Sequence, residues 1–264
     1  MPTKQRLDSL VFERQLAPSR ELARRYIMAG EVRVNGQVVD KPGTLVAADA
    51  DVSVEGQARF VSRGGEKLAA ALEAFGVVVD GQVCADVGAS TGGFTDCLLQ
   101  YGASKVYAID VGYGQLAHKL RIDPRVAVLE RTNARNLAAL PETVDVVVMD
   151  VSFISLRLLF PAMRSWLKPQ ANVVPLIKPQ FEAGREDVGK GGVVKDPAVH
   201  RRVLLEVLTA AQSWDLQAHG LIRSPIQGAK EGNTEFLAWL RWGTGQPGPV
   251  IEALVETVLP PDAS

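Results

Sequence analysis

From about residue 77 onward, short apolar runs alternate with longer segments of helical periodicity. The apolar runs predict β-strands at 83–85, 105–109, 126–129, 144–149, 172–177 and 236–240. Helices are expected between them, at 95–101, 156–167 and 197–213. This alternation favours an α/β fold, a doubly wound, Rossmann-like sheet whose binding site lies at the carboxyl ends of the strands.

The first part of the chain has a different pattern. Amphipathic helices are expected from Arg6 and over 20–28, the second with Ser19 as its N-cap. A β-hairpin with an Asn-Gly turn is expected over 32–39, and a further short strand at 52–54. Because two helices and a few short strands can bury only a little apolar area, this part should be a compact accessory module.

These patterns divide the chain into two domains. We expect a small α+β module at 1–58, a linker at 59–64 and the larger α/β domain at 65–264. A helix that ends at Phe75 opens the larger domain. Its Lys67 lies in the first turn, where the helix dipole disfavours a cation. Taken alone, Lys67 would be a surface lysine on an amphipathic helix.

A glycine-rich loop follows the strand at 83–85. It reads Asp86-Val87-Gly88-Ala89-Ser90-Thr91-Gly92-Gly93-Phe94. Glycines let the backbone approach a ligand closely, at the point where the next helix begins. The spacing is that of neither a dinucleotide fingerprint nor a P-loop. It resembles motif I of methyltransferases that use S-adenosylmethionine, and the alternative is a tight turn without a ligand.

A second acid supports an adenosine-bearing ligand. Asp110 ends the next strand roughly 20 residues after the loop, where an acid can bind ribose hydroxyls. Taken alone, it is equally well a turn residue. Asn133 or Arg135 is expected near the adenine. The S-adenosylmethionine site should therefore include Asp86, Gly88, Ser90, Thr91, Gly93, Phe94, Asp110, Asn133, Arg135 and Asp150.

Ionisable residues also stand at the ends of the later strands. Asp150 and Lys178 should converge with Asp86 and Asp110 on one edge of the sheet. The stretch that begins at Asp150 lacks the N-P-P-Y-like motif of amino-group methylases, and no cysteine is placed to attack a base carbon. A strand-end lysine suits a ribose hydroxyl, because a neutral lysine can take its proton.

The composition of the chain mainly excludes certain classes of protein and site. The 264 residues include 29 basic and 30 acidic ones, so any nucleic-acid surface must be a local patch. Two cysteines, Cys84 and Cys97, exclude a disulfide framework and are expected to be buried thiols. The 3 histidines are scattered, and neither a secretory signal nor an apolar run of 18 residues is present. We expect a soluble cytoplasmic protein that binds neither metal nor membrane.

Basic residues of the first module form a candidate RNA surface. Arg20, Arg24 and Arg25 recur at near-helical spacing, but glutamates interleave, so a solvated helix face is the alternative. The stretch from Ser19 to Gly36 resembles the alpha-L RNA-binding motif of a ribosomal protein and several pseudouridine synthases. That resemblance implies that the module grips structured RNA. The expected RNA contacts are Arg6, Arg20, Arg24, Arg25, Arg33 and Arg63.

The strand-end lysine and aspartate resemble the K-D-K-E group of FtsJ-like ribose 2′-O-methyltransferases. The resemblance implies that Lys67 and Lys178 are the two lysines, Asp150 the aspartate and Glu235 the glutamate, with Glu231 as a near competitor. Lys178 would be the base or would orient the hydroxyl, and Asp150 and Lys67 would place it. Glu235 would hold the lysines or the ribose.

Nearly the whole chain resembles the TlyA family, historically called haemolysins. The diagnostic stretches are 62–68, 150–155, 176–182 and 189–194. The resemblance implies 2′-O-methylation of cytidine in the RNA of the large ribosomal subunit, or of both subunits. We expect a monomer or weak dimer that binds ribosomal RNA or ribosomal subunits.

Two other functions stay open, a membrane-lytic haemolysin and an RNA-binding protein with an inactive methyltransferase fold. The chain has neither an apolar span nor a long basic amphipathic helix, which argues against the first. All four K-D-K-E residues are present, which argues against the second.

Overall fold

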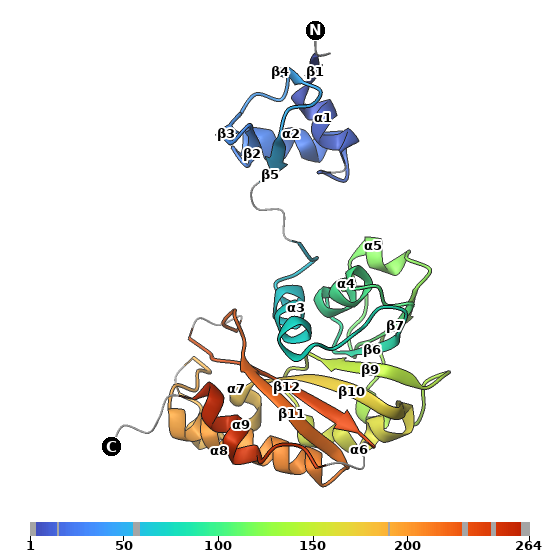
Figure 1. The fold of residues 1–264 in the computed structure, drawn as a ribbon, viewed down its shortest axis with the longest axis vertical. Helices are drawn as coiled ribbons and strands as arrows, with labels where there is room; N and C mark the ends of the chain where they lie inside the picture. Colours follow the sequence, from blue (N-terminus) through green and yellow to red (C-terminus); the bar gives the residue numbers. More distant parts are fainter. Residues whose placement is uncertain are drawn as a thin grey trace. The chain divides into compact units, whose positions relative to one another are not determined.

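The chain folds as two compact units, Met1–Ala58 and Arg59–Ser264 (Figure 1). The computed structural model describes residues 4–14, 16–54, 59–189, 191–228, 232–243 and 247–259. Each unit has an apolar core of its own.

The smaller unit packs two helices against short antiparallel strands. Its elements are β1 (Lys4–Arg6), α1 (Leu7–Glu13), α2 (Arg20–Met28), β2 (Val32–Val34), β3 (Gln37–Val38), β4 (Leu45–Ala47) and β5 (Val52–Val54). Ser19 caps α2 by accepting a hydrogen bond from the Leu22 amide. Asn35 and Gly36 both have positive φ, as a tight hairpin turn requires. The predicted second helix, its cap and the hairpin are confirmed, whereas β1 and β4 were not predicted.

A seven-stranded sheet forms the centre of the larger unit, in the order β11-β12-β10-β9-β6-β7-β8. The strands are β6 (Val83–Val87), β7 (Lys105–Ile109), β8 (Val126–Leu129), β9 (Val144–Met149), β10 (Leu167–Ile177), β11 (Leu216–Arg223) and β12 (Phe236–Trp242). Strands β10, β9, β6, β7 and β8 are parallel, and β12 is antiparallel to both of its neighbours. The predicted α/β sheet is confirmed, with β11 in addition.

Helices cover both faces of this sheet (Figure 1). One face packs against α3 (Gly64–Phe75), α4 (Gly93–Gln100) and α5 (His118–Arg121). The other packs against α6 (Phe160–Met163), α8 (Pro197–Gln212) and α9 (Ile251–Val258). Cys84 and Cys97 are buried free thiols in the first of these cores, as predicted.

Two expectations differ from the structure, and one helix was not predicted. The helix predicted over 156–167 is divided into η2 (Leu156–Leu158), α6 and η3 (Arg164–Trp166), since Pro161 lacks the amide that a continuous helix would use. The helix without a prediction is α9, which buries Val255. The segment 59–64, expected to be a linker, belongs to the larger unit, because Phe60 is buried in its core and α3 already begins at Gly64.

Candidate active site

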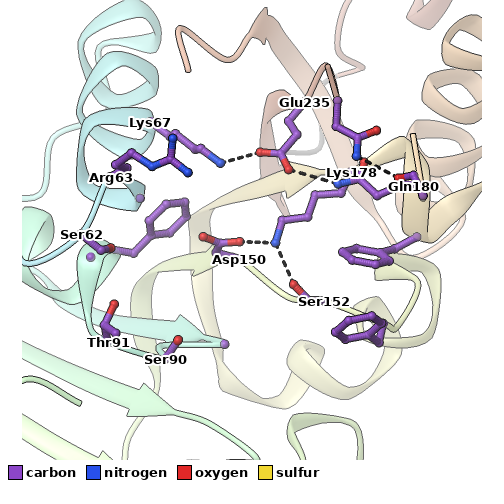
Figure 2. Close-up of a pocket in the computed structure, with 18 of the residues that line it drawn as sticks. Ser62, Arg63, Lys67, Ser90, Thr91, Asp150, Ser152, Lys178, Gln180 and Glu235 are labelled. Carbon is purple, nitrogen blue, oxygen red and sulfur yellow. Dashed lines mark hydrogen bonds and ion pairs between the residues drawn. The ribbon is translucent and has the colours of Figure 1, made fainter. Parts of the chain in front are cut away.

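A cavity of about 850 Å³ opens where β6, β9 and β10 end, at the carboxyl edge of the sheet. The glycine-rich loop and the start of α3 line it on one side. The segments after β9 and β10 and the start of β12 line it on the other (Figure 2). This edge is the usual place for a ligand site in a doubly wound sheet.

The glycines of the loop are required by close packing around the cavity. Gly88 has φ +85°, and a Cβ there would lie 2.5 Å from the backbone oxygen of Asp150. A Cβ at Gly93 would lie 2.1 Å from Ser62 Oγ. A larger residue at either position would therefore clash with the chain at the end of β9 or with the chain that precedes α3. Because α4 starts at Gly93, its first amides also offer hydrogen-bond donors for a carboxylate.

The lining fits S-adenosylmethionine. The cavity has the volume of a small-molecule site, and its wall combines an open glycine cradle with a helix N-terminus. Gly88, Ser90, Thr91, Gly93 and Phe94 all line it, as predicted from the sequence.

Asp86 does not line the cavity. Its side chain is fully buried beneath the loop, where Oδ2 accepts a 2.6 Å hydrogen bond from Thr95 Oγ1. Oδ1 has no hydrogen-bond partner among the described residues. Burial raises the pKa of Asp86 to about 7. Asp86 therefore supports the loop from below and is not part of the cavity lining, and its role in cofactor binding stays a prediction.

Asp110 lies at the other end of the loop, outside the large cavity. Its carboxylate accepts hydrogen bonds from the backbone amides of Ser90, at 2.7 Å, and Gly112, at 2.6 Å. Asp110, Gln115 and Glu130 line a small space of about 10 Å³. Asp110 therefore connects the glycine loop to the chain after β7, and ribose binding by this carboxylate stays a prediction.

Asn133 and Arg135 lie away from the cavity lining. Asn133 Oδ1 accepts a 3.0 Å hydrogen bond from the Arg135 amide and so caps η1 (Ala134–Asn136). Both residues are exposed. Their predicted position near the adenine remains a prediction.

The four K-D-K-E residues form two ion pairs that line the same cavity (Figure 2). Lys67 Nζ lies 2.5 Å from Glu235 Oε2, and both side chains are at most 10% exposed. Lys178 Nζ lies 2.6 Å from Asp150 Oδ1, with 11% and 25% of the side chains exposed. Lys67 is thus a buried ion-pair partner, and its reading as a surface lysine is wrong. Glu231, the competitor for the acid, lies outside the described residues.

Neutral side chains extend each of the two ion pairs. Lys178 Nζ donates to Ser152 Oγ at 3.1 Å, and Gln180 Nε2 donates to Glu235 Oε1 at 3.2 Å. Asn233 is buried, and its amide binds the Gly192 carbonyl and the Val194 amide, which holds the 191–194 segment against the cavity. Sequence analysis missed these three residues, although Ser152 and Gln180 stand two positions after Asp150 and Lys178.

A buried acid joins the two segments that carry Asp150 and Lys178. Glu182 accepts hydrogen bonds from Ser155 Oγ at 2.6 Å and from the Leu156 amide at 2.8 Å. Burial raises the pKa of Glu182. The loop after β9 is therefore tied to α7 (Pro179–Glu182), directly after Lys178.

Exposed groups surround the mouth of the cavity. Phe153 is 91% exposed with φ +61°, and its ring centroid lies 4.9 Å from that of Phe181. Arg63 and Arg185 are exposed and line the cavity. Arg185 was not among the predicted RNA contacts, because a lone arginine in a loop carries no recognisable pattern.

The predicted basic surface of the smaller unit is only partly free. Arg6 and Arg20 pair with the buried Asp8, at 2.9 and 3.3 Å, and the hydrogen bond from Arg6 lowers the pKa of Asp8 to about 2. These two arginines therefore also stabilise the fold. Arg24 and Arg25 are exposed on α2, whereas Arg33 donates to the Gly36 carbonyl.

Comparison with known proteins gives the same division of the chain. The FtsJ-like methyltransferase family model matches residues 60–242, and the S4 domain model matches residues 5–52.

Similar proteins extend over nearly the full length. YqxC from Bacillus subtilis is 50% identical over 250 residues, which cover 93% of this chain and 89% of that protein. The 16S/23S rRNA (cytidine-2′-O)-methyltransferase TlyA from Mycobacterium tuberculosis is 48% identical over 248 residues, 92% of each protein. A solved structure from Streptococcus thermophilus that is named a hemolysin has a TM-score of 0.72 and 42% identity. It covers 97% of this chain and 96% of that one.

Proposed function

Because the chain belongs to the FtsJ-like methyltransferase family and to the TlyA relatives within it, we propose that it methylates the 2′-hydroxyl of cytidine in ribosomal RNA. S-adenosylmethionine is the cofactor. When bound, it supplies an electrophilic methyl group on a positively charged sulfur. The glycine cradle from Gly88 to Gly93 and the N-terminus of α4 would hold it.

The observation that carries this proposal is the pair of ion pairs beside the glycine cradle. Lys178, fixed by Asp150 and Ser152, offers a point donor or proton acceptor to a hydroxyl that enters the cavity. The Asp150–Lys178 pair would orient this oxygen and take up its proton. Lys67 and Glu235 form the back of the site and would bind the remaining ribose oxygens.

The mouth of the cavity suits a nucleotide drawn out of an RNA strand. The exposed Phe153 ring, packed on Phe181, offers a stacking surface for a base. Arg63 and Arg185 would contact the neighbouring phosphates. The S4 unit would add a separate grip on structured RNA through Arg24 and Arg25.

Ribosomal RNA is the substrate class, and this would place the chain in the cytoplasm with assembling ribosomes. Whether one subunit or both are modified, and whether the chain acts as a monomer or weak dimer, are finer parts of the proposal. The haemolysin reading has no structural support: within the described ranges, no helix is long and apolar enough to cross a membrane.

The test is transfer of radiolabelled methyl from S-adenosylmethionine to purified small subunits, large subunits and the naked RNA of each. We expect label in RNA of at least one assembled subunit. Failure to label any ribosomal RNA, while the protein binds S-adenosylmethionine by calorimetry, would favour the inactive RNA-binding alternative.

A further inference from the structure

A second pocket lies at the edge of the sheet opposite the candidate active site. Its volume is about 330 Å³, and it forms where β6 and β9 begin and where β12 ends. β12 leads from Glu235 to Arg241, six residues or about 20 Å further along an extended strand. α3 makes the same passage, from Lys67 to the Val77-Val78 segment that lines this pocket. The two sites are therefore distinct.

Arg241 in this pocket is a half-buried cation without its expected partner. Among the described residues, its buried Nε has no hydrogen-bond acceptor. A guanidinium stays charged and carries five N–H donors. Buried polar atoms are rarely left unpaired, so the described part of the fold does not satisfy this guanidinium. Because Nε is shielded from solvent, an acceptor from outside the chain would bind the terminal nitrogens, on the part of Arg241 that lines the cavity.

The side-chain oxygens of Asp145 and Asn172, which also line the pocket, accept hydrogen bonds from other donors. Asp145 accepts from the Val83 amide at 3.0 Å and is neutralised by Lys168 at 2.8 Å. Asn172 Oδ1 accepts from Trp239 Nε1 at 2.8 Å. With Lys168 counted as the partner of Asp145, the charged groups at the pocket sum to one net positive charge, that of Arg241.

Arg241 is not needed as a cap for α3 either. The last carbonyls of that helix already accept hydrogen bonds, from the Val77 amide to Leu72 and from the Gly76 amide to Glu73. This is a self-contained helix ending that needs no side-chain cation.

An aromatic wall stands beside the arginine. The Trp239 ring stacks on Phe75 at 6.1 Å and packs on His219 at 5.4 Å. Burial and then the charge of Arg241 lower the pKa of His219, so this imidazole adds no second charge at neutral pH. Trp239 lies on β12, as Arg241 does, and both residues line the pocket.

We propose that this pocket binds a phosphate group, carried either by a free nucleotide or by an RNA backbone. A guanidinium matches phosphate oxygens with two parallel hydrogen bonds, and the Asn172 amide can add a third donor. Trp239 offers a surface for the attached ribose or base. The cavity volume lies at the lower end of the range for small-molecule sites.

The test follows the arginine itself. In the ¹⁵N-labelled full chain, the Arg241 Nε–H and Trp239 Nε1–H signals are recorded during titration with inorganic phosphate and then with cytidine monophosphate, at constant ionic strength. We expect saturable shifts of both signals, and Arg241→Gln should abolish the shift at Trp239. Arg164→Gln is the matched control, because Arg164 is exposed and lies 5.0 Å over the Trp242 ring but lines no described pocket. Absence of a saturable shift, or an equal shift with sodium chloride, overturns the proposal.

Methylation kinetics then separate the two phosphate sources. If RNA backbone occupies the pocket, Arg241→Gln should raise KM for the ribosomal substrate, leave kcat unchanged and lower the salt slope of binding by about one. If free nucleotide is the ligand, KM stays unchanged while the nuclear magnetic resonance shift is lost. The spectroscopic test needs no activity, so its failure is distinguishable from failure of the proposed methyl transfer.

Discussion

Replacing Lys178 by alanine tests the proposed chemistry most sharply. The variant removes an ammonium that lies 2.6 Å from Asp150 and 3.1 Å from Ser152, at the point where a ribose hydroxyl would enter. A proton-transfer role contributes typically about 10²–10⁴-fold. The activation free energy of methyl transfer should therefore rise by about 3–5 kcal/mol.

The fold should tolerate this change. Breaking a fully buried ion pair costs about 3–5 kcal/mol, but Asp150 is 25% exposed and water can reach the carboxylate that is left. We therefore expect a loss of less than about 3 kcal/mol in the free energy of unfolding. S-adenosylmethionine binding, measured by calorimetry, should be unchanged. The side-chain partners of Lys178 are Asp150 and Ser152, and neither belongs to the glycine loop.

The assay is single-turnover methyl transfer to ribosomal RNA at saturating cofactor. Lys178→Arg should keep a cation beside Asp150 but lose most of the rate, because the planar guanidinium cannot act as a point donor or base. Lys105→Ala is the matched control. It removes a 2.7 Å ion pair with Glu142 at the amino edge of the sheet and should leave the rate unchanged. A rate for Lys178→Ala within tenfold of the parent would refute this assignment.

Three further predictions concern residues around the site. Asp110→Ala should weaken S-adenosylmethionine binding in calorimetry, with and without RNA. The variant leaves the Ser90 and Gly112 amides without their acceptor and removes the proposed ribose acceptor. An unchanged affinity would exclude Asp110 from the site. Arg24→Ala with Arg25→Ala should weaken binding to ribosomal RNA and reduce its salt slope by about 1.5–2, and an identical slope would mean that this face is merely solvated. The parent should lose stability relative to Asp86→Asn as pH rises.

The sign for Asp86 follows from its raised pKa. A folded value of about 7 lies above the ordinary 3.8, so the neutral carboxyl contributes stability that is complete below pH 4 and lost as pH rises through 7. An amide cannot ionise, so urea unfolding at pH 5 and pH 8 should show the parent losing about 3 kcal/mol relative to the variant. Parallel stabilities at the two pH values would contradict this assignment.

The sheet could be predicted because its parallel strands are continuous apolar runs, and the acids and lysine that follow them necessarily meet at one edge. β11 was missed because His219 and Gly220 interrupt its pattern and a register shift occurs beside them. The prediction of one helix over 156–167 was wrong at Pro161, because hydrophobic periodicity alone takes no account of a proline that interrupts a helix.

Within the site, residue types were predictable but partners were not. Four K-D-K-E positions were correctly placed around one cavity. The pairing of Lys67 with Glu235 depends on how α3 packs on β12, and that of Lys178 with Asp150 on the register of β9 and β10. The sequence alone does not fix either arrangement. Asp86 shows the same limit, because an acid at a strand end can face either the cavity or the core.

The chemical position of the transferred methyl group tests the central claim most directly. Ribosomal RNA methylated by the purified chain is digested to nucleosides, and the phosphodiester next to the labelled cytidine is challenged with alkali. The account predicts 2′-O-methylcytidine and a bond that resists cleavage, because the hydroxyl that would attack the phosphorus is blocked. A methyl group on a base nitrogen or carbon, with the neighbouring bond still labile, would contradict it.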